Sequence, residues 1–121
     1  MSLFIKHHSY DGRRYEFVVT GDQIARCPKW DAEKEANPPL SAAAALAKAR
    51  EFISTIKTKD DLEWGFEGLV LVNLDGWIWQ ARYGLVRKQG IMTGVWPKMD
   101  CWILMDGTVV QPRIRVMEDT K

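Results

Sequence analysis

The chain has 121 residues, of which 46% are hydrophobic and 27% are charged, and its formal net charge is +1. These values are typical of one soluble globular domain, which we expect to span residues 1–121 with an ordered core from about residue 4 to about residue 116. A net charge near zero argues against nucleic acid as the main partner. No apolar run approaches the roughly 20 residues that a membrane-spanning helix requires, so we expect no transmembrane segment.

The first predicted element is an antiparallel hairpin of residues 3–10 and 13–20. Asp11-Gly12 separates the two strands, and Asp-Gly suits a two-residue type I′ turn because both central residues need a positive φ. The register set by this turn gives four pairs: Tyr10 with Arg13, His8 with Tyr15, Lys6 with Phe17 and Phe4 with Val19. Their apolar members Phe4, Tyr15, Phe17 and Val19 share one face, which we expect to meet the helix.

Residues 21–39 are rich in charge and end in two prolines, so we expect a connecting loop that Ile24, Cys27 and Trp30 fix to the core. The only long helix is predicted at residues 40–57. This segment has no Gly, Pro or Val and is rich in alanine, the strongest helix former. Ser41 is placed to cap it. Apolar residues recur at spacings of three and four and form one face: Ala45, Leu46, Ala49, Phe52, Ile53 and Ile56.

A second hairpin is predicted from residues 64–74 and 77–86, again around an Asp-Gly pair. A two-residue turn there gives five pairs: Leu74 with Trp77, Val72 with Trp79, Val70 with Ala81, Gly68 with Tyr83 and Phe66 with Leu85. This face carries no charged residue, so we expect it to pack over the helix.

The last predicted hairpin consists of residues 101–105 and 108–116, after a long loop of residues 87–100 with a short strand at residues 91–96. Pro112 cannot donate to a strand ladder and therefore marks an edge or an irregularity. The element order is β-β-α-β-β-β-β. We therefore predict the α+β class, as a roll in which one long helix packs on a single curled antiparallel sheet.

This order and two short motifs resemble small PepSY-like, cystatin-like proteins. The motifs are Pro39-Leu40-Ser41 opening an alanine-rich helix and the closing hairpin of residues 102–112, and the resemblance covers about residues 37–116. It implies a cystatin/PepSY-like fold and a role in inhibition or regulation by contact. Many such proteins are uncharacterised bacterial proteins predicted to be exported, which implies a periplasmic or exported protein. The short start Met1-Ser2-Leu3 is compatible with an expression remnant in front of a truncated native chain.

The resemblance carries over no site residue. Cystatins inhibit papain-like proteases with a Gln-x-Val-x-Gly hairpin, and residues 89–94 have an extra residue and no valine. The adjacent His7 and His8 point to opposite faces of a strand, which disfavours a shared metal. Cys27 and Cys101 are compatible with one disulfide or with two buried thiols. We expect no catalytic residue, no metal and no cofactor.

The outer face of the predicted sheet is unusually apolar, and its residues are our candidate binding site: Leu69, Leu71, Ile78, Trp102, Leu104 and Val109. A patch of this kind usually marks an interface, unless residues 21–39 or 87–100 fold over it. The first hypothesis is a non-enzymatic interaction module that binds a protein partner or forms a homodimer. The alternative is a small-ligand-binding protein or minor enzyme with a pocket between helix and sheet, near Trp64, Trp79 and Tyr83.

Overall fold

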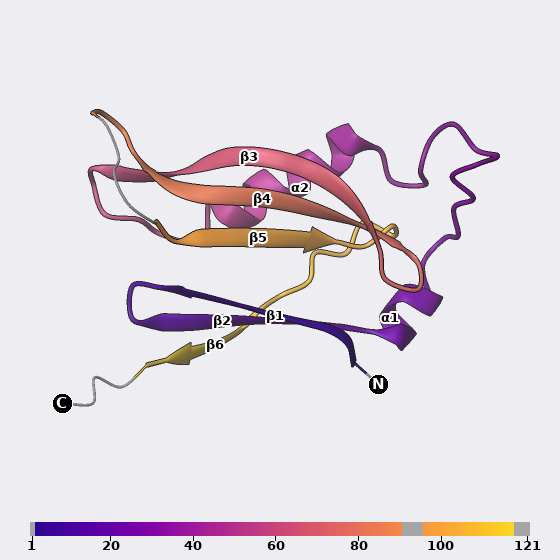
Figure 1. Cartoon of the computed structure of the whole chain (residues 1–121), viewed down its shortest axis with the longest axis horizontal. Helices are drawn as coiled ribbons and strands as arrows, with labels where there is room; N and C mark the ends of the chain where they lie inside the picture. Colours follow the sequence, from indigo (N-terminus) through magenta and orange to yellow (C-terminus); the bar gives the residue numbers. More distant parts are fainter. Residues whose placement is uncertain (1, 91–95, 118–121) are drawn as a thin grey trace.

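The computed structural model describes residues 2–90 and 96–117, with side chains from residue 6 onward. Two three-stranded antiparallel sheets form the body of the protein (Figure 1). The terminal sheet has the order β1-β2-β6, with β1 at Ser2–Tyr10, β2 at Arg13–Thr20 and β6 at Arg113–Val116. The central sheet has the order β3-β4-β5, with β3 at Leu62–Asn73, β4 at Trp77–Arg87 and β5 at Lys98–Ile103. The helices are α1 (Gly21–Ala25) and α2 (Ala42–Ile53).

The predicted fold class, one long helix on a single curled sheet, is wrong. Strands far outweigh helices in the described part of the chain, and the strands divide between two three-stranded sheets. The division arises because the third hairpin does not continue past Val110, whose N–H donates to the Trp102 carbonyl at 2.8 Å. Pro112 has no N–H to extend that ladder. The chain then crosses to the terminal sheet, where β6 pairs with β2 and sets Arg113 opposite Glu16.

The first hairpin has the predicted register in all four pairs. Asp11 and Gly12 both have positive φ, at 53° and 72°, as a type I′ turn requires. Tyr15, Phe17 and Val19 are buried on one face, whereas the side chain of Phe4 lies outside the described residues.

The helix α2 has the predicted cap and is shorter than expected. The Ser41 hydroxyl accepts from the N–H of Ala44, and the helix ends at Ile53. Two indoles of the central sheet hold its flanks, because Trp79 donates to the Leu40 carbonyl and Trp64 donates to the Ile56 carbonyl. Phe17 and Phe52 meet edge to face with centroids 6.1 Å apart, so α2 also contacts the terminal sheet.

The second hairpin differs from the prediction by one residue on β3 from Gly68 to Asn73, and by two residues before an irregularity between Phe66 and Gly68, where Phe66 pairs with Tyr83. Asn73, not Leu74, pairs with Trp77, so the loop contains three residues. The Asn73 side chain accepts from the N–H of Gly76 at 3.0 Å and stabilises this longer loop. Leu69 and Leu71 consequently lie opposite Ala81 and Trp79 on the side of the helix, while Val70 turns away from it.

The predicted loop of residues 21–39 begins with a short helix. The Thr20 hydroxyl and the Gln23 side chain form a reciprocal capping box at the start of α1. The expected anchors are confirmed: Ile24 and Cys27 are buried, and Trp30 lies edge to face with Trp77 at 5.4 Å. The predicted short strand at residues 91–96 falls almost entirely outside the described residues.

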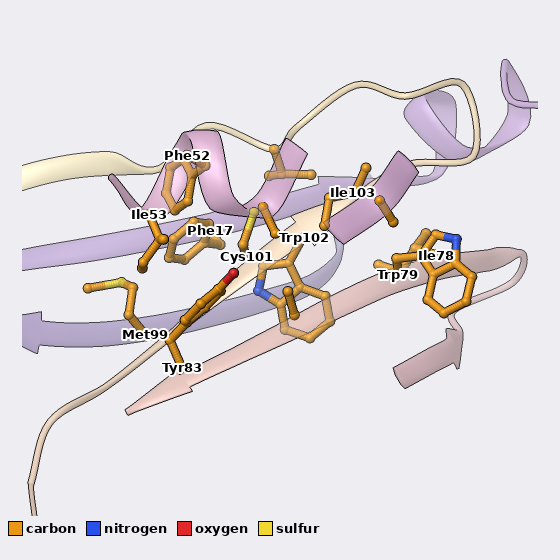
Figure 2. Packing of buried hydrophobic residues seen from close by; sticks show 14 of the residues in the cluster. Phe17, Phe52, Ile53, Ile78, Trp79, Tyr83, Met99, Cys101, Trp102 and Ile103 are labelled. Atoms are coloured by element: carbon orange, nitrogen blue, oxygen red, sulfur yellow. The ribbon is translucent and has the colours of Figure 1, made fainter. Parts of the chain in front are cut away.

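The core fills the space between α2 and the two sheets (Figure 2). Tyr83, Leu85 and Trp79 of β4 are buried as predicted. Every residue of β5 from Met99 to Ile103 is buried, so this strand is enclosed on both faces. Cys101 is part of this core, and neither it nor Cys27 forms a disulfide.

Candidate functional site

The six residues predicted to form an outer binding face do not form one exposed surface. Ile78, Trp102 and Leu104 are buried, with exposed fractions of 1%, 3% and 2%. Leu69 and Leu71 are partly buried and face the helix side because of the one-residue shift in β3. Val109 is partly buried against the core. The expectation of a continuous apolar patch from these residues is therefore wrong.

Two segments from the N-terminal part of the chain pack against this region. Ile24 of α1 lies against Gly76, where an added Cβ would come within 2.2 Å of the isoleucine side chain. From β1, the ring of His8 reaches Asp100 of β5. The Ile24 contact agrees with the alternative in which residues 21–39 help to cover the face, whereas the cover from β1 was not predicted.

Two of the three residues expected around a ligand pocket belong to the packed core. Trp79 and Tyr83 have exposed fractions of 6% and 3%, and Figure 2 shows both among the core side chains. The Tyr83 hydroxyl has no hydrogen-bond partner among the described residues, and burial raises its pKa. Trp64 is partly buried, and its ring packs edge to face on Tyr10 with centroids 5.1 Å apart. It also lines an open hollow of about 380 Å³ between the end of α2 and β3.

A buried polar cluster joins the two sheets where β1 lies beside β5. His8 Nε2 lies 3.4 Å from Asp100 Oδ2, and the Gln80 amide donates to the same oxygen at 3.0 Å. Burial by itself would raise the pKa of Asp100. The hydrogen bonds from His8 and Gln80 and the charge of His8 outweigh the effect of burial, so the pKa of Asp100 lies below its ordinary value. His8 and Gln80 both contact the Asp100 carboxylate, so this cluster links β1 of the terminal sheet to the central sheet.

Both cysteine thiols are buried and take part in packing or hydrogen bonding within the fold. Burial and the neighbouring Asp100 carboxylate raise the pKa of Cys101 to about 12, so its thiol stays protonated near neutral pH. The Cys27 thiol donates to the Gln23 carbonyl at 3.2 Å. Neither arrangement activates a nucleophile.

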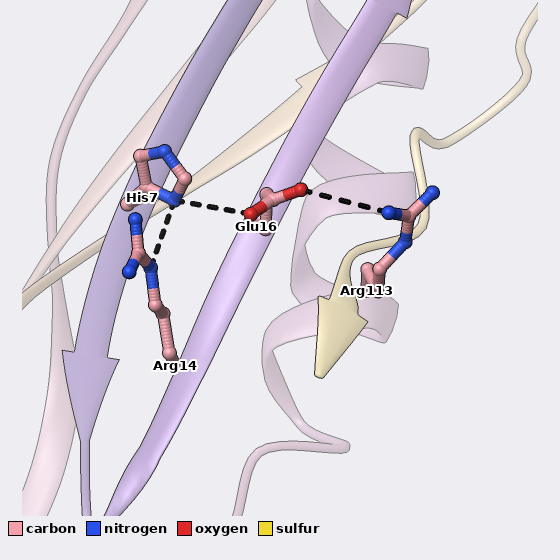
Figure 3. A network of polar contacts seen from close by, with 4 residues as sticks. All are labelled: His7, Arg14, Glu16 and Arg113. Atoms are coloured by element: carbon pink, nitrogen blue, oxygen red, sulfur yellow. Dashed lines mark hydrogen bonds and ion pairs between the residues drawn. The ribbon is translucent and has the colours of Figure 1, made fainter. Parts of the chain in front are cut away.

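His7 belongs to a surface network on the outer face of the terminal sheet (Figure 3). Its Nδ1 accepts from Arg14 Nε at 3.0 Å and lies 3.5 Å from Glu16, which also faces Arg113 at 3.9 Å. Among the described residues, no group of three or more His, Cys, Asp or Glu side chains is arranged to hold a metal ion. The acidic residues Asp60 and Asp61 line a shallow cleft with Arg87 and Lys88.

The free edge of β3 is the surface that the sequence reasoning missed. β3 is the outermost strand of the central sheet and pairs, within the described part of the chain, only with β4. It is 12 residues long, and its second half, Gly68 to Asn73, has neither a charge nor a proline. Phe66 and Val70 are 50% and 40% exposed.

The one charge in the middle of β3 does not shield this edge. The Glu67 carboxylate turns back across β4 and pairs with Lys98 of β5. Gly84 permits this crossing, since a Cβ there would lie 2.5 Å from the Glu67 carboxylate and 3.0 Å from the Lys98 ammonium. Native edge strands are usually short, charged or interrupted, because an open row of N–H and C=O groups pairs readily with another strand. β3 is interrupted by an irregularity between Phe66 and Gly68, and the run that follows it, Gly68 to Asn73, has none of these protections.

No protein-family model, curated protein sequence or solved structure matches this chain. Within the described residues, no helix is long and apolar enough to cross a membrane.

Proposed function

We propose that the chain is a binding module without a catalytic role, which acts by pairing the free edge of β3 with a strand of a protein partner. The simplest partner is a second copy of the chain. The observation that carries this proposal is a 12-residue edge strand whose uncharged second half exposes Val70. Addition of a strand to such an edge is a common mode of protein recognition, in which main-chain hydrogen bonds supply affinity.

The sequence of β3 is compatible with self-pairing. Two antiparallel β3 strands related by a two-fold axis at Val70 place Leu69 of each copy opposite Leu71 of the other. Gly68 then lies opposite Val72, and no charged side chains meet. Favourable cross-strand pairs each stabilise a sheet by about 0.2–1 kcal/mol, whereas like charges directly opposite destabilise it.

An inhibitory or regulatory role, which the resemblance to PepSY-like domains implies, fits within this proposal because both act by contact. A partner that occupies β3 would extend the central sheet without rearranging its core, since β4 and β5 remain paired as they are.

Light scattering across a concentration series tests the proposal with two matched variants. Val70→Lys places two like charges together at the proposed two-fold axis, and Val116→Lys adds the same charge at a 75% exposed valine outside β3. We expect the wild-type mass to rise toward twice that of one chain. Val70→Lys should weaken association at least about tenfold, and Val116→Lys should behave as wild type.

Circular dichroism would establish that both variants are folded. A wild-type chain that remains monomeric up to its solubility limit contradicts self-pairing. Association that Val70→Lys leaves unchanged contradicts the assignment to β3.

A further inference from the structure

A groove lies between α2 and the inner face of β6, which belongs to the terminal sheet and not to the sheet that contains β3. It consists of two hollows of about 250 Å³ and about 310 Å³. Phe52, Thr55 and Gln111 line both hollows, so the two adjoin each other along the helix. Together they extend over a stretch of α2 long enough to face several residues of an extended segment.

The lining combines apolar side chains with an excess of positive charge. Its apolar residues come from β2, α2 and the segment leading into β6: Tyr15, Phe52, Ile56, Val109, Pro112 and Ile114. Its charged residues are three cations, Arg13, Lys48 and Lys57, and one anion, Glu51. The apolar lining is therefore suited to apolar side chains, and the net positive charge around it favours a segment of net negative charge.

β6 forms one border of this groove and has a free edge of its own. Within the described residues it is the outermost strand of the terminal sheet and pairs only with β2. Ile114 lies opposite the buried Tyr15 and so faces the groove, with 53% of its surface exposed. Arg113 and Arg115 alternate with it and therefore lie on the outer face.

The outer face beside β6 is positively charged. Arg115 lies opposite Arg14 of β2, and Arg113 lies opposite Glu16. Glu16 is shared between Arg113 and His7, as Figure 3 shows, and its side chain is 17% exposed. The Glu16 carboxylate thus lies among the guanidinium groups of Arg14, Arg113 and Arg115.

This charge excludes one occupant of the β6 edge and favours another. Two antiparallel copies of β6 paired at Ile114 would place Arg113 of each copy opposite Arg115 of the other, and like charges opposed across strands are destabilising. A strand with acidic residues at those positions would instead meet both arginines with opposite charge.

We propose that the β6 edge and the adjoining groove bind an extended segment of a protein partner in which acidic residues alternate with apolar ones. Side chains alternate between the two faces of a strand. The acidic residues therefore meet Arg113 and Arg115, while the apolar residues enter the groove beside Ile114 and Phe52.

The probe is a capped seven-residue peptide of alternating glutamate and valine, titrated into the isotope-labelled full chain and followed by NMR. A matched peptide of alternating lysine and valine is the comparison. We expect amide shifts in β6 and along the C-terminal half of α2, and binding of the glutamate peptide at least about tenfold tighter. This difference should shrink as salt is added, because the arginines are exposed.

A charge-altered variant tests which residues carry the preference. Arg115→Glu combined with Arg113→Gln changes the charge of β6 by three units, and it keeps a favourable pair between position 115 and Arg14. Its matched control is Lys29→Glu combined with Lys34→Gln, which makes the same change in exposed residues after α1. We expect the β6 variant to lose the tenfold preference for the glutamate peptide and the control to retain it.

Two results would overturn the proposal: an unchanged preference in the β6 variant, or peptide-induced shifts that centre on β3. The site shares no residue with β3, so the outcome is independent of the self-pairing proposed there.

Discussion

The two sheets of this protein end in edges of opposite character. The edge of the central sheet, β3, is 12 residues long, and its second half is uncharged. The edge of the terminal sheet, β6, is four residues long and carries an arginine at every second position. Length and charge decide what an edge strand can pair with, so the first favours a copy of itself and the second disfavours one.

The difference follows from what lies behind each strand. β3 belongs to a sheet whose far strand, β5, is buried on both faces from Met99 to Ile103. β6 is reached only after Pro112 ends the pairing with β5, and all four of its residues are exposed. A strand that adds to a finished core needs few apolar residues, which leaves its alternate positions free for charge.

The largest expected effect tests whether the two edges belong to one cooperative unit. Phe17→Ala removes a fully buried ring that packs edge to face on two others. Its centroid lies 6.1 Å from that of Phe52 in α2 and 6.0 Å from that of His8. We expect the free energy of unfolding to fall by about 3–5 kcal/mol. Urea denaturation followed by tryptophan fluorescence and by circular dichroism measures it.

Val18→Ala is the control for Phe17→Ala, since Val18 is adjacent in β2 and only partly buried. It should cost about 1 kcal/mol or less. Separate transitions in the two signals would show that the sheets unfold independently, and the edges would then have to be considered as parts of two units.

The joint between the sheets should give the next largest effect. Asp100→Asn removes the charge that His8 and Gln80 contact, and we expect a loss of about 2 kcal/mol at pH 7. Because the pKa of Asp100 is lowered in the folded state, its contribution is present above the unfolded value of about 4. That contribution is lost as the pH falls through the folded value.

Urea denaturation at pH 7 and at pH 3 would measure this linkage. The gap in stability between wild type and Asp100→Asn should narrow at the lower pH. A gap that stays constant would show that the Asp100 charge is not what joins β1 to β5.

Local turn chemistry explains which part of the fold could be predicted from the sequence. The register of the first hairpin is correct because both residues of its Asp-Gly turn adopt positive φ. The second Asp-Gly pair lies in a three-residue loop, because the Asn73 side chain accepts from the N–H of Gly76. Both registers keep apolar residues on the inner face, so the hydrophobic pattern alone could not distinguish them.

The candidate edges depend on strand order, which the sequence reasoning did not reach. β2 and β6 pair although about a hundred residues separate them, and no local signal specifies that contact. Two signals were nevertheless present. The run Gly68 to Asn73 lacks any charge, and the stretch from Arg113 to Val116 alternates arginine with an aliphatic residue.

Replacing the two arginines of β6 should have the smallest effect on stability and tests most directly whether charge keeps the β6 edge from pairing with a copy of itself. In the Val70→Lys background, where self-pairing of β3 is removed, Arg113→Val and Arg115→Val give β6 an uncharged edge. We expect stability to change by only about 0.5 kcal/mol, because both arginines are exposed and Arg115 opposes Arg14.

Self-association should nevertheless return in this triple variant, now through β6, with Ile114 of two copies side by side. Light scattering detects the association, and amide exchange locates the newly protected strand. The same arginines replaced by lysines provide the control, which should remain monomeric because the charge is kept. If the valine variant also stays monomeric, the length of β6 and not its arginines limits its pairing, because a four-residue strand offers too few main-chain hydrogen bonds to hold two copies together.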